Sequence, residues 1–223
     1  MFDRVKEICL NLAPAAVFAD IGCDHGFMTK YMLENDLCER AYVSDISAKS
    51  LQKAELLLAE YVAAGRCIPV VANGLEGIPE RCSEALIAGM GGEEIVKILS
   101  KRPLPERFVL QPMKNADKVR LHLIERGAGI ERDYTFGEDK FYDLIVGTAA
   151  GGSHYSEKEL MYGRDNLRNP TWAFLNKLLH DANNLRIALA APALSERRRV
   201  EVRGRLREIE VITDEIKGLV SGD

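Results

Sequence analysis

The sequence has no long apolar run and no closely spaced pair of cysteines. No stretch approaches the roughly 20 consecutive apolar residues of a membrane-spanning helix. The N-terminal MFDRVKEICLNL mixes charges into its apolar positions, unlike the core of a signal peptide. The five cysteines lack Cys-x-x-Cys spacing and a histidine at metal-site spacing, which argues against a zinc cluster or a disulfide framework. We therefore expect a cytoplasmic protein with no membrane segment and no metal.

The chain also lacks a strong excess of either charge, since its net charge is -4 over 223 residues. Locally the balance differs. Residues 96–126 carry eight Lys or Arg against three Asp or Glu, and residues 196–207 carry six arginines against two glutamates. One such block is typical of a solvated helix face, but two blocks in a mildly acidic chain favour an anionic partner.

Short apolar runs alternate with helical patterns through the first two thirds of the chain. The runs lie at 17–22, 41–46, 67–73, 84–89 and 107–112, and the helices are predicted at 3–12, 29–37, 48–64, 93–100 and 116–126. This alternation predicts an α/β fold, a doubly wound Rossmann-like sheet. Two further runs, 130–139 and 140–149, leave no room for a helix, so the last strand should be antiparallel. That ending is typical of class I methyltransferases.

The character of the sequence changes near Gly151, and we divide the chain into a domain at 1–152 and a helical domain at 153–223. Two long helices are predicted in the second part, joined at Ala191-Pro192 as an antiparallel hairpin with a coiled-coil seam. The first has an apolar stripe of Trp172, Leu175, Leu179, Ala182, Leu185 and Leu189, and the second a seam of Val202, Leu206, Ile209, Thr213, Ile216 and Val220. Two roles are open for the hairpin: it packs against the rest of the protein or against a second subunit, or it binds substrate. The sequence therefore leaves open whether the chain is a monomer or a dimer.

The stretch FADIGCDHG, from Phe18 to Gly26, points to a nucleoside site. A strand runs into a turn with Asp20, Gly22 and Gly26, where a helix begins and free N–H groups face a ligand. The dinucleotide motif Gly-x-Gly-x-x-Gly is missing, because Asp24 stands at its second glycine. A carboxylate there repels a pyrophosphate but suits the sulfonium or amino group of S-adenosylmethionine.

Residues at the ends of the next two strands fit the same cofactor. Asp45 follows Asp20 by 25 residues, close to the spacing of an acidic residue that binds ribose hydroxyls. At the end of the third strand, Asn73 is placed to read the adenine edge. We expect Ile46, Gly74 and Leu75 to complete this side of the pocket.

The segments ADIGCDHG, IAGMGGEEI, VLQPM and EDKFYDLIVG, in this order and followed by a helical hairpin, resemble the bacterial tRNA adenine-N1 methyltransferases, which modify adenine 22 of tRNA. The resemblance covers nearly the whole chain. It implies a cofactor pocket of Asp20, Gly22, Asp24, His25, Gly26, Asp45, Asn73 and the loop Gly89, Met90, Gly91 and Gly92. Many enzymes that methylate adenine amino groups have an Asn/Asp-Pro-Pro-Tyr/Phe motif at this loop, and its absence here agrees with N1 chemistry.

Adenine N1 has an in-plane lone pair, so its attack on a sulfonium methyl requires no strong general base. Catalysis would then consist of positioning and exclusion of water. Gln111, at the end of the fifth strand, is predicted to hold the adenine, and Asp24 to stabilise the amine or the cationic product. Contacts to tRNA phosphates are predicted for Lys97, Lys101, Arg102, Lys114, Lys118, Arg120 and the Arg197–Arg207 block.

Three alternatives remain at this point. The first is a methyltransferase of the same fold that acts on another RNA, a small molecule or a protein, and the second is an RNA-binding protein without catalytic activity. An NAD-dependent enzyme is the third, and Asp24 and the closing hairpin disfavour it.

Overall fold

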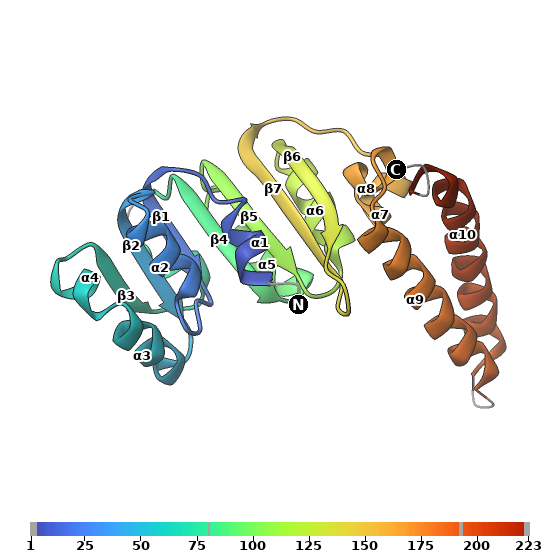
Figure 1. Ribbon diagram of the computed structural model, residues 1–223, viewed down its shortest axis with the longest axis horizontal. Helices are drawn as coiled ribbons and strands as arrows, with labels where there is room; N and C mark the ends of the chain where they lie inside the picture. The colour runs from blue at the N-terminus through green and yellow to red at the C-terminus, as the bar shows by residue number, and fades with distance from the viewer. Residues whose placement is uncertain (1–3, 80, 192–193, 221–223) are drawn as a thin grey trace.

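The computed structural model describes residues 4–79, 81–191 and 194–220. Its centre is a seven-stranded sheet in the order β3-β2-β1-β4-β5-β7-β6, drawn edge to edge in Figure 1. The strands are β1 (Ala15–Ile21), β2 (Cys38–Asp45), β3 (Cys67–Val71), β4 (Glu84–Met90), β5 (Arg107–Pro112), β6 (Ala128–Phe136) and β7 (Tyr142–Gly151). The first five pair in parallel, and β7 is antiparallel to both of its neighbours. The predicted α/β fold and its closing hairpin are confirmed.

Helices cover both faces of the sheet because successive strand residues point to opposite sides. In β4, Leu86 packs with α1 (Arg4–Cys9), α2 (Phe27–Glu34) and α3 (Ala48–Leu57). Its neighbours Ala85 and Ile87 pack with α5 (Gly92–Ser100), α6 (Ala116–Glu125) and the 3-10 turn η1 (Gly74–Gly77). Apolar runs with both faces buried therefore lie in the middle of the sheet.

The helix predicted at 48–64 is interrupted. It forms α3 and a separate short helix, α4 (Ala59–Ala63), because Leu58 leaves the helical path and is fully buried between them. Periodicity alone predicted one continuous helix here, and that prediction is wrong.

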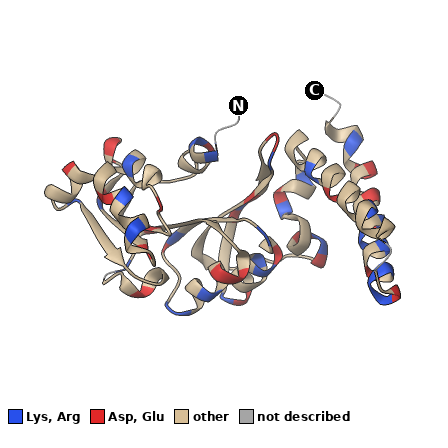
Figure 2. Cartoon of the chain, turned by 90° about the horizontal axis from the view of Figure 1, so that it is seen from below, with Lys and Arg blue, Asp and Glu red and all other residues tan. Residues whose placement is uncertain are grey.

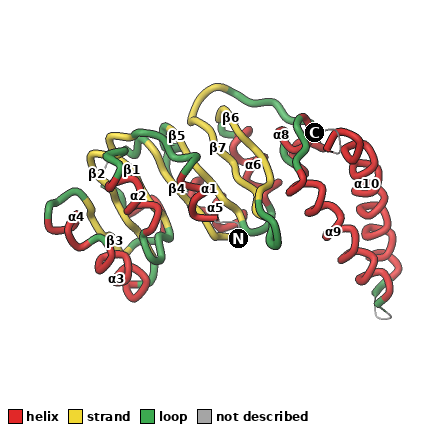
Figure 3. The backbone as a smooth tube through the Cα atoms, viewed as in Figure 1, coloured by secondary structure: helices red, strands yellow, loops and turns green. Residues whose placement is uncertain are grey.

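Beyond β7 the chain is helical, with α7 (Glu157–Tyr162), α8 (Arg164–Arg168), α9 (Trp172–Ala190) and α10 (Glu196–Val220). The long helices α9 and α10 pack against each other as a hairpin that extends past the β6 edge of the sheet (Figures 1 and 3). Its core holds the predicted seam residues Ile209, Thr213 and Ile216. Whether the two parts of the chain fold separately stays a prediction.

The apolar stripe predicted for α9 is partly wrong. Trp172 and Leu179 are 58% and 42% exposed, whereas Phe174 and Leu178 are buried. The helix carries apolar residues on two adjacent faces, and contacts with Tyr162 and α10 select the face that holds Phe174 and Leu178.

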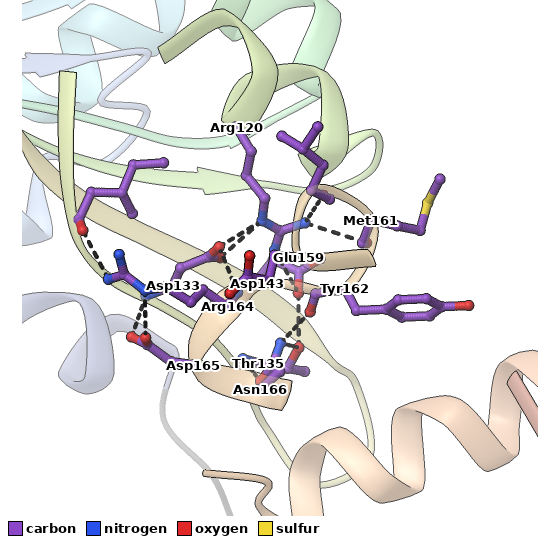
Figure 4. Close-up of polar contacts among 12 residues, drawn as sticks. Arg120, Asp133, Thr135, Asp143, Glu159, Met161, Tyr162, Arg164, Asp165 and Asn166 are labelled. Carbon is purple, nitrogen blue, oxygen red and sulfur yellow. Dashed lines mark hydrogen bonds and ion pairs between the residues drawn. The ribbon is translucent and has the colours of Figure 1, made fainter. Parts of the chain in front are cut away.

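A buried polar cluster fastens the helical part to β6, the edge strand of the sheet (Figure 4). The Asp165 carboxylate accepts from the backbone N–H of Asp133 at 2.8 Å, and the Asn166 side chain accepts from that of Thr135 at 2.8 Å. These side chains occupy the donors that an additional strand would otherwise pair with, so they close the edge.

Candidate cofactor site

The predicted nucleoside turn lies where the sheet reverses its strand order. β1 is flanked by β2 on one side and β4 on the other, and the chain leaves β1 and β4 toward opposite faces. Ligands of open α/β sheets bind outside the carboxyl ends of the strands at such a point. Two cavities are found there, on either side of Gly22.

The Asn73 cavity, with a volume of about 80 Å³, lies against the ends of β2 and β3. Asp45 lies on its wall, and one oxygen of the Asp45 carboxylate accepts from the backbone N–H of Ser47 at 2.7 Å. This bond fixes the carboxylate in one orientation. The predicted residues on its wall are Gly22, Asp45, Ile46, Asn73, Gly74 and Met90.

The His25 cavity, of about 290 Å³, lies beside the first turn of α2 and under α1. Asp24 adopts a left-handed backbone conformation with φ 44°. Its carboxylate binds His25 Nδ1 at 2.8 Å and Lys53 Nζ at 3.1 Å. Desolvation opposes ionisation of Asp24, but the hydrogen bonds from Lys53 and His25 outweigh it and lower the pKa of Asp24. A fixed anion therefore stands on the wall of this cavity.

Met90 separates the two cavities. Its terminal methyl group lies 2.1 Å from the point where a Cβ atom on Gly22 would stand, and Gly22 itself has φ 72°. Glycine is thus required at this turn both for its backbone conformation and for the close approach of Met90. A ligand that reaches from Asp45 to Asp24 passes over Gly22 and contacts Met90.

Asp20 lies beneath the turn rather than on a cavity wall. It is 1% exposed and accepts from the Thr29 hydroxyl at 2.8 Å. Burial raises the pKa of its carboxyl group to about 6 against the lowering effect of that bond. Gly26 is also buried, and a Cβ there would lie about 3 Å from Leu58 and Ala54 of the neighbouring helix. Its role in this structure is helix packing.

The loop after β4 contacts the loop that follows the neighbouring strand β5. The backbone N–H of Gly92 donates to the Lys114 carbonyl at 2.8 Å, and a Cβ at Gly92 would lie 2.1 Å from the Asn115 carbonyl oxygen. Gly89 has φ 80° and carries no side chain into the His25 cavity that it lines. Gly91 lines neither cavity, and Leu75 faces a different one near Arg102.

The Lys114 cleft is a third hollow, of about 600 Å³, between the end of β5, the β6–β7 connection and the helices α9 and α10. Met113 lies on the walls of both this cleft and the His25 cavity. Gln111 is fully buried behind it, and its amide N–H donates to the Pro112 carbonyl at 3.1 Å. A Gln111 side chain with no exposed surface does not touch a base in this conformation, contrary to the prediction from sequence.

The predicted phosphate contacts are scattered in the structure. Of the cations at 97–120 that were predicted to contact phosphates, only Lys114 lines the cleft, and Arg205 of the second block joins it there. Lys118 pairs with Glu93, Lys101 pairs with Glu76, and Lys97 lies exposed on α5.

Two of the predicted phosphate-binding arginines support the fold. Arg120 is 1% exposed and its Nε–H faces both carboxylate oxygens of Asp133 at 2.9 Å, so the prediction of a phosphate contact is wrong for this residue. Arg102 donates to the backbone carbonyls of Leu75 and Ile78, near the amino ends of the strands. Around each of these two guanidinium groups, the fold places carboxylate or carbonyl oxygens from distant parts of the chain. Such contacts cannot be read from the sequence.

The basic block of α10 is also partly occupied. Arg199 donates to the Leu189 and Ala191 carbonyls and closes the turn of the hairpin. Arg197 and Arg198 pair with Glu201. In Figure 2 basic and acidic residues accordingly alternate along the hairpin.

Several residues of these walls were not predicted from the sequence, and three of them bring a charge or a thioether to the site. Arg4 reaches the His25 cavity from α1, Glu94 reaches the Asn73 cavity from the first turn of α5, and Met113 lies between cavity and cleft. The charged pattern of the first helix gave no sign that one cation faces a ligand site.

Other classes of site are not found in the described ranges. No group of three or more His, Cys, Asp or Glu is arranged to hold a metal ion within residues 4–79, 81–191 and 194–220. In the same part of the chain, no helix combines the length and hydrophobicity needed to cross a membrane. All five cysteines are described, are buried and form no disulfide.

Comparisons with known proteins agree with this geometry. Residues 1–145 match the model of a family described as methyltransferase domain. The tRNA (adenine(22)-N(1))-methyltransferase of Bacillus subtilis is 30% identical over 152 residues, which are 66% of this chain and 64% of that protein. The chain thus matches slightly less than two thirds of this relative's length.

Solved structures share the fold over nearly the whole chain. Streptococcus pneumoniae Sp1610 in complex with S-adenosyl-L-methionine is 25% identical, with a TM-score of 0.85 over 96% of this chain and all of that one. Mycoplasma capricolum TrmK in complex with S-adenosyl-homocysteine is 21% identical, with a TM-score of 0.86 over 97% and 99%. These relatives confirm the resemblance to the tRNA adenine-N1 methyltransferases that the sequence motifs indicated. Since the family model covers more than half of its residues, the chain belongs to the methyltransferase-domain family.

Proposed function

We propose that this chain transfers a methyl group from S-adenosylmethionine to N1 of an adenine in tRNA, at position 22. The observation that carries the proposal is the pair of cavities on either side of Gly22, with Asp45 and Asn73 on one side and Asp24 on the other. The choice of acceptor follows the related Bacillus subtilis protein, a tRNA (adenine(22)-N(1))-methyltransferase.

The donor set fits the cofactor. The oriented Asp45 carboxylate suits ribose hydroxyls, and the exposed Asn73 amide suits the edge of an adenine. Asp24, kept ionised by Lys53 and His25, suits a cationic ammonium or sulfonium group. When bound, S-adenosylmethionine supplies an electrophilic methyl group.

The acceptor side offers positioning rather than acid–base chemistry. Gly89 leaves the rim of the His25 cavity without a side chain, and Met90 and Met113 form apolar walls that exclude water. Adenine N1 attacks with its own lone pair, so these walls and the fixed Asp24 meet the need of the reaction. We propose that Gln111 acts through its contact with Met113, whose sulfur lies 3.6 Å from the amide nitrogen.

The target adenine must leave its stack to reach this rim, because a base in a duplex is inaccessible. The Lys114 cleft lies next to the His25 cavity, because Met113 is on the wall of both. We propose that tRNA lies across this cleft, with Lys114 and Arg205 at its phosphates, and that the protein works in the cytoplasm.

Mass spectrometry of nucleosides tests the proposal. Unmodified tRNA is incubated with the protein and S-adenosylmethionine, and the expected product is N1-methyladenosine. A transcript with guanosine at position 22 is the matched control and should remain unmethylated. N6-methyladenosine as the product, or methylation of the control transcript, would refute the assigned atom or position.

A methyltransferase for a small molecule or a protein is the rival function. It predicts binding of S-adenosylhomocysteine without any gel shift of bulk tRNA. An RNA-binding protein without activity predicts the reverse, a gel shift without cofactor binding in a calorimeter.

A further inference from the structure

Two aromatic side chains meet in the Lys114 cleft. Phe141 lies at the end of the β6–β7 connection and His180 lies in α9, so the sheet supplies one ring and the hairpin supplies the other. The ring centroids are 6.3 Å apart and the ring planes are inclined by 56°. At this inclination neither ring covers the face of the other, and the pair forms an open wedge on the cleft wall.

The two rings contribute little to the packing of the protein. His180 is exposed and Phe141 is half-buried, and neither belongs to the apolar core of the sheet or of the hairpin. The buried cluster around Asp133 already attaches the helices to β6. Ring surface is therefore left over for a ligand in the cleft.

The charges of the cleft do not form a track for phosphates. Its walls carry as many carboxylates as lysines and arginines, namely Asp117, Asp139, Asp143 and Asp181 against Lys114, Lys140, Lys177 and Arg205. Affinity for a nucleic acid backbone depends on an excess of cations, which is missing here. RNA in this cleft consequently needs contacts with its bases as well.

The apolar side chains of the cleft suit the flat face of a base. Met113 and Met161 are 52% and 42% exposed, and both lie on the same walls as the two rings. Polarizable thioethers and aromatic rings both pack well against the face of a base. Because Met113 also lines the His25 cavity, these surfaces lie next to the place where the methyl group is transferred. A nucleotide joined to the target adenine can thus occupy the cleft while the target reaches the cavity.

We propose that Phe141 and His180 stack on the base of the nucleotide that adjoins the target adenine in tRNA. The inference rests on the proposed function, because it requires tRNA in the cleft. When the target leaves its stack, the neighbouring base loses a stacking partner, and the rings replace that partner. Phe141 and His180 are positioning residues, since they hold the RNA strand and do not touch the reacting atoms.

A double-mutant cycle between protein and RNA isolates the contact. Fluorescence anisotropy gives Kd values for intact tRNA and for three synthetic tRNAs, which have an abasic nucleotide at the target, immediately 5′ of it or immediately 3′ of it. Phe141→Leu and His180→Ala should each raise the Kd of intact tRNA about tenfold, as for one lost stacking contact. With one of the two flanking abasic tRNAs, the same variants should change the Kd less than about twofold, because no base is left to stack on the rings.

Three further variants complete the design. Phe141→Tyr and His180→Phe keep a ring at each position and should bind intact tRNA as the wild type does. Trp172→Leu is the matched control, because Trp172 is an exposed aromatic residue of α9 outside the cleft, and it should leave every Kd unchanged. Calorimetry with S-adenosylhomocysteine reports that each variant is folded, since neither ring lines the two cofactor cavities.

The inference fails if Phe141→Leu and His180→Ala leave the Kd of intact tRNA unchanged. It also fails if they weaken intact and abasic tRNAs by the same factor, which would mean that the rings only join the hairpin to the sheet. Coupling to the abasic target alone would assign the rings to the target adenine instead of its neighbour. A wild-type protein that does not bind tRNA would refute the proposed function itself, a separate result.

Discussion

Asp20 ends β1 inside the protein, where its carboxyl group has no room for water. Its pKa rises from 3.8 to about 6, so the folded protein holds this proton more tightly than the unfolded chain. The contribution of Asp20 to stability is therefore greatest below pH 4 and is lost as the pH rises through 6. At neutral pH the Asp20 carboxylate is a buried charge that costs stability.

Asp20→Asn should accordingly stabilise the protein at pH 7 by at most about 3 kcal/mol, the equivalent of a shift of about two pH units. The amide oxygen still accepts from Thr29, so the local geometry is kept. Thermal unfolding of both proteins from pH 4 to pH 8 measures this, and the difference should vanish toward pH 4. The same change at the exposed Asp139 serves as control. A destabilised Asp20→Asn at pH 7 would contradict the expectation.

Gly92 shows a different residue-scale constraint, the contact of its Cα with the Asn115 carbonyl across two loops. Gly92→Ala should lower the stability by about 1–3 kcal/mol through overpacking, and should weaken cofactor binding because the loop after β4 shifts. Chemical denaturation and calorimetry measure the two effects.

Gly204→Ala is the matched control for that change. Gly204 is exposed in α10 and nothing lies within 4 Å of an added Cβ. Here alanine should stabilise by about 0.5–1 kcal/mol through helix propensity. Equal effects at the two glycines would mean that the contact with Asn115 is unimportant.

At the scale of elements, one buried ion pair adds to the hydrogen bonds of Asp165 and Asn166 that attach α7 and α8 to β6. Arg120 binds Asp133 (Figure 4). It also donates to the Leu160 carbonyl at 3.1 Å, near the end of α7. Sheet and helical hairpin are thus joined through a side chain of α6.

Arg120→Leu should destabilise the protein by about 3–5 kcal/mol, because Asp133 is left charged and buried without its partner. The double variant Arg120→Leu, Asp133→Leu should recover much of the loss. Lys118→Leu, which breaks only the exposed pair with Glu93, should leave the unfolding midpoint unchanged. A double variant as unstable as the single one would show that hydrogen bonds to the helix carbonyls, not the ion pair, hold the elements.

At the scale of the whole molecule, the exposed basic residues are scattered, and the proposal places tRNA at the Lys114 cleft alone. Lys114→Ala should weaken tRNA binding and reduce the slope of log K against log salt by about one. Lys97→Ala, outside the cleft, should leave both unchanged. Fluorescence anisotropy from 50 to 200 mM salt compares them, and a larger effect at Lys97 would move the RNA to the outer face of α5.

The sequence by itself determined which segments form the strands and helices of the sheet, and where the nucleoside turn lies. Alternating apolar runs, the closing pair of strands and the glycines around Asp24 are local patterns, and they predicted an α/β fold and a site at residues 20–26 because such patterns depend only on neighbours in the chain. Asp45 and Asn73 followed, since parallel strands bring their carboxyl ends to one edge.

Only the tertiary structure decided which side chains at that edge face a ligand. Arg4 and Glu94 reach the cavities from helices whose sequence patterns indicate no site. Arg120 is buried because Asp133 and the end of α7 surround it. The choice between two apolar faces of α9 likewise depended on its partners. The common physical reason is that burial and charge pairing are set by contacts between distant segments, which periodicity along the chain does not contain.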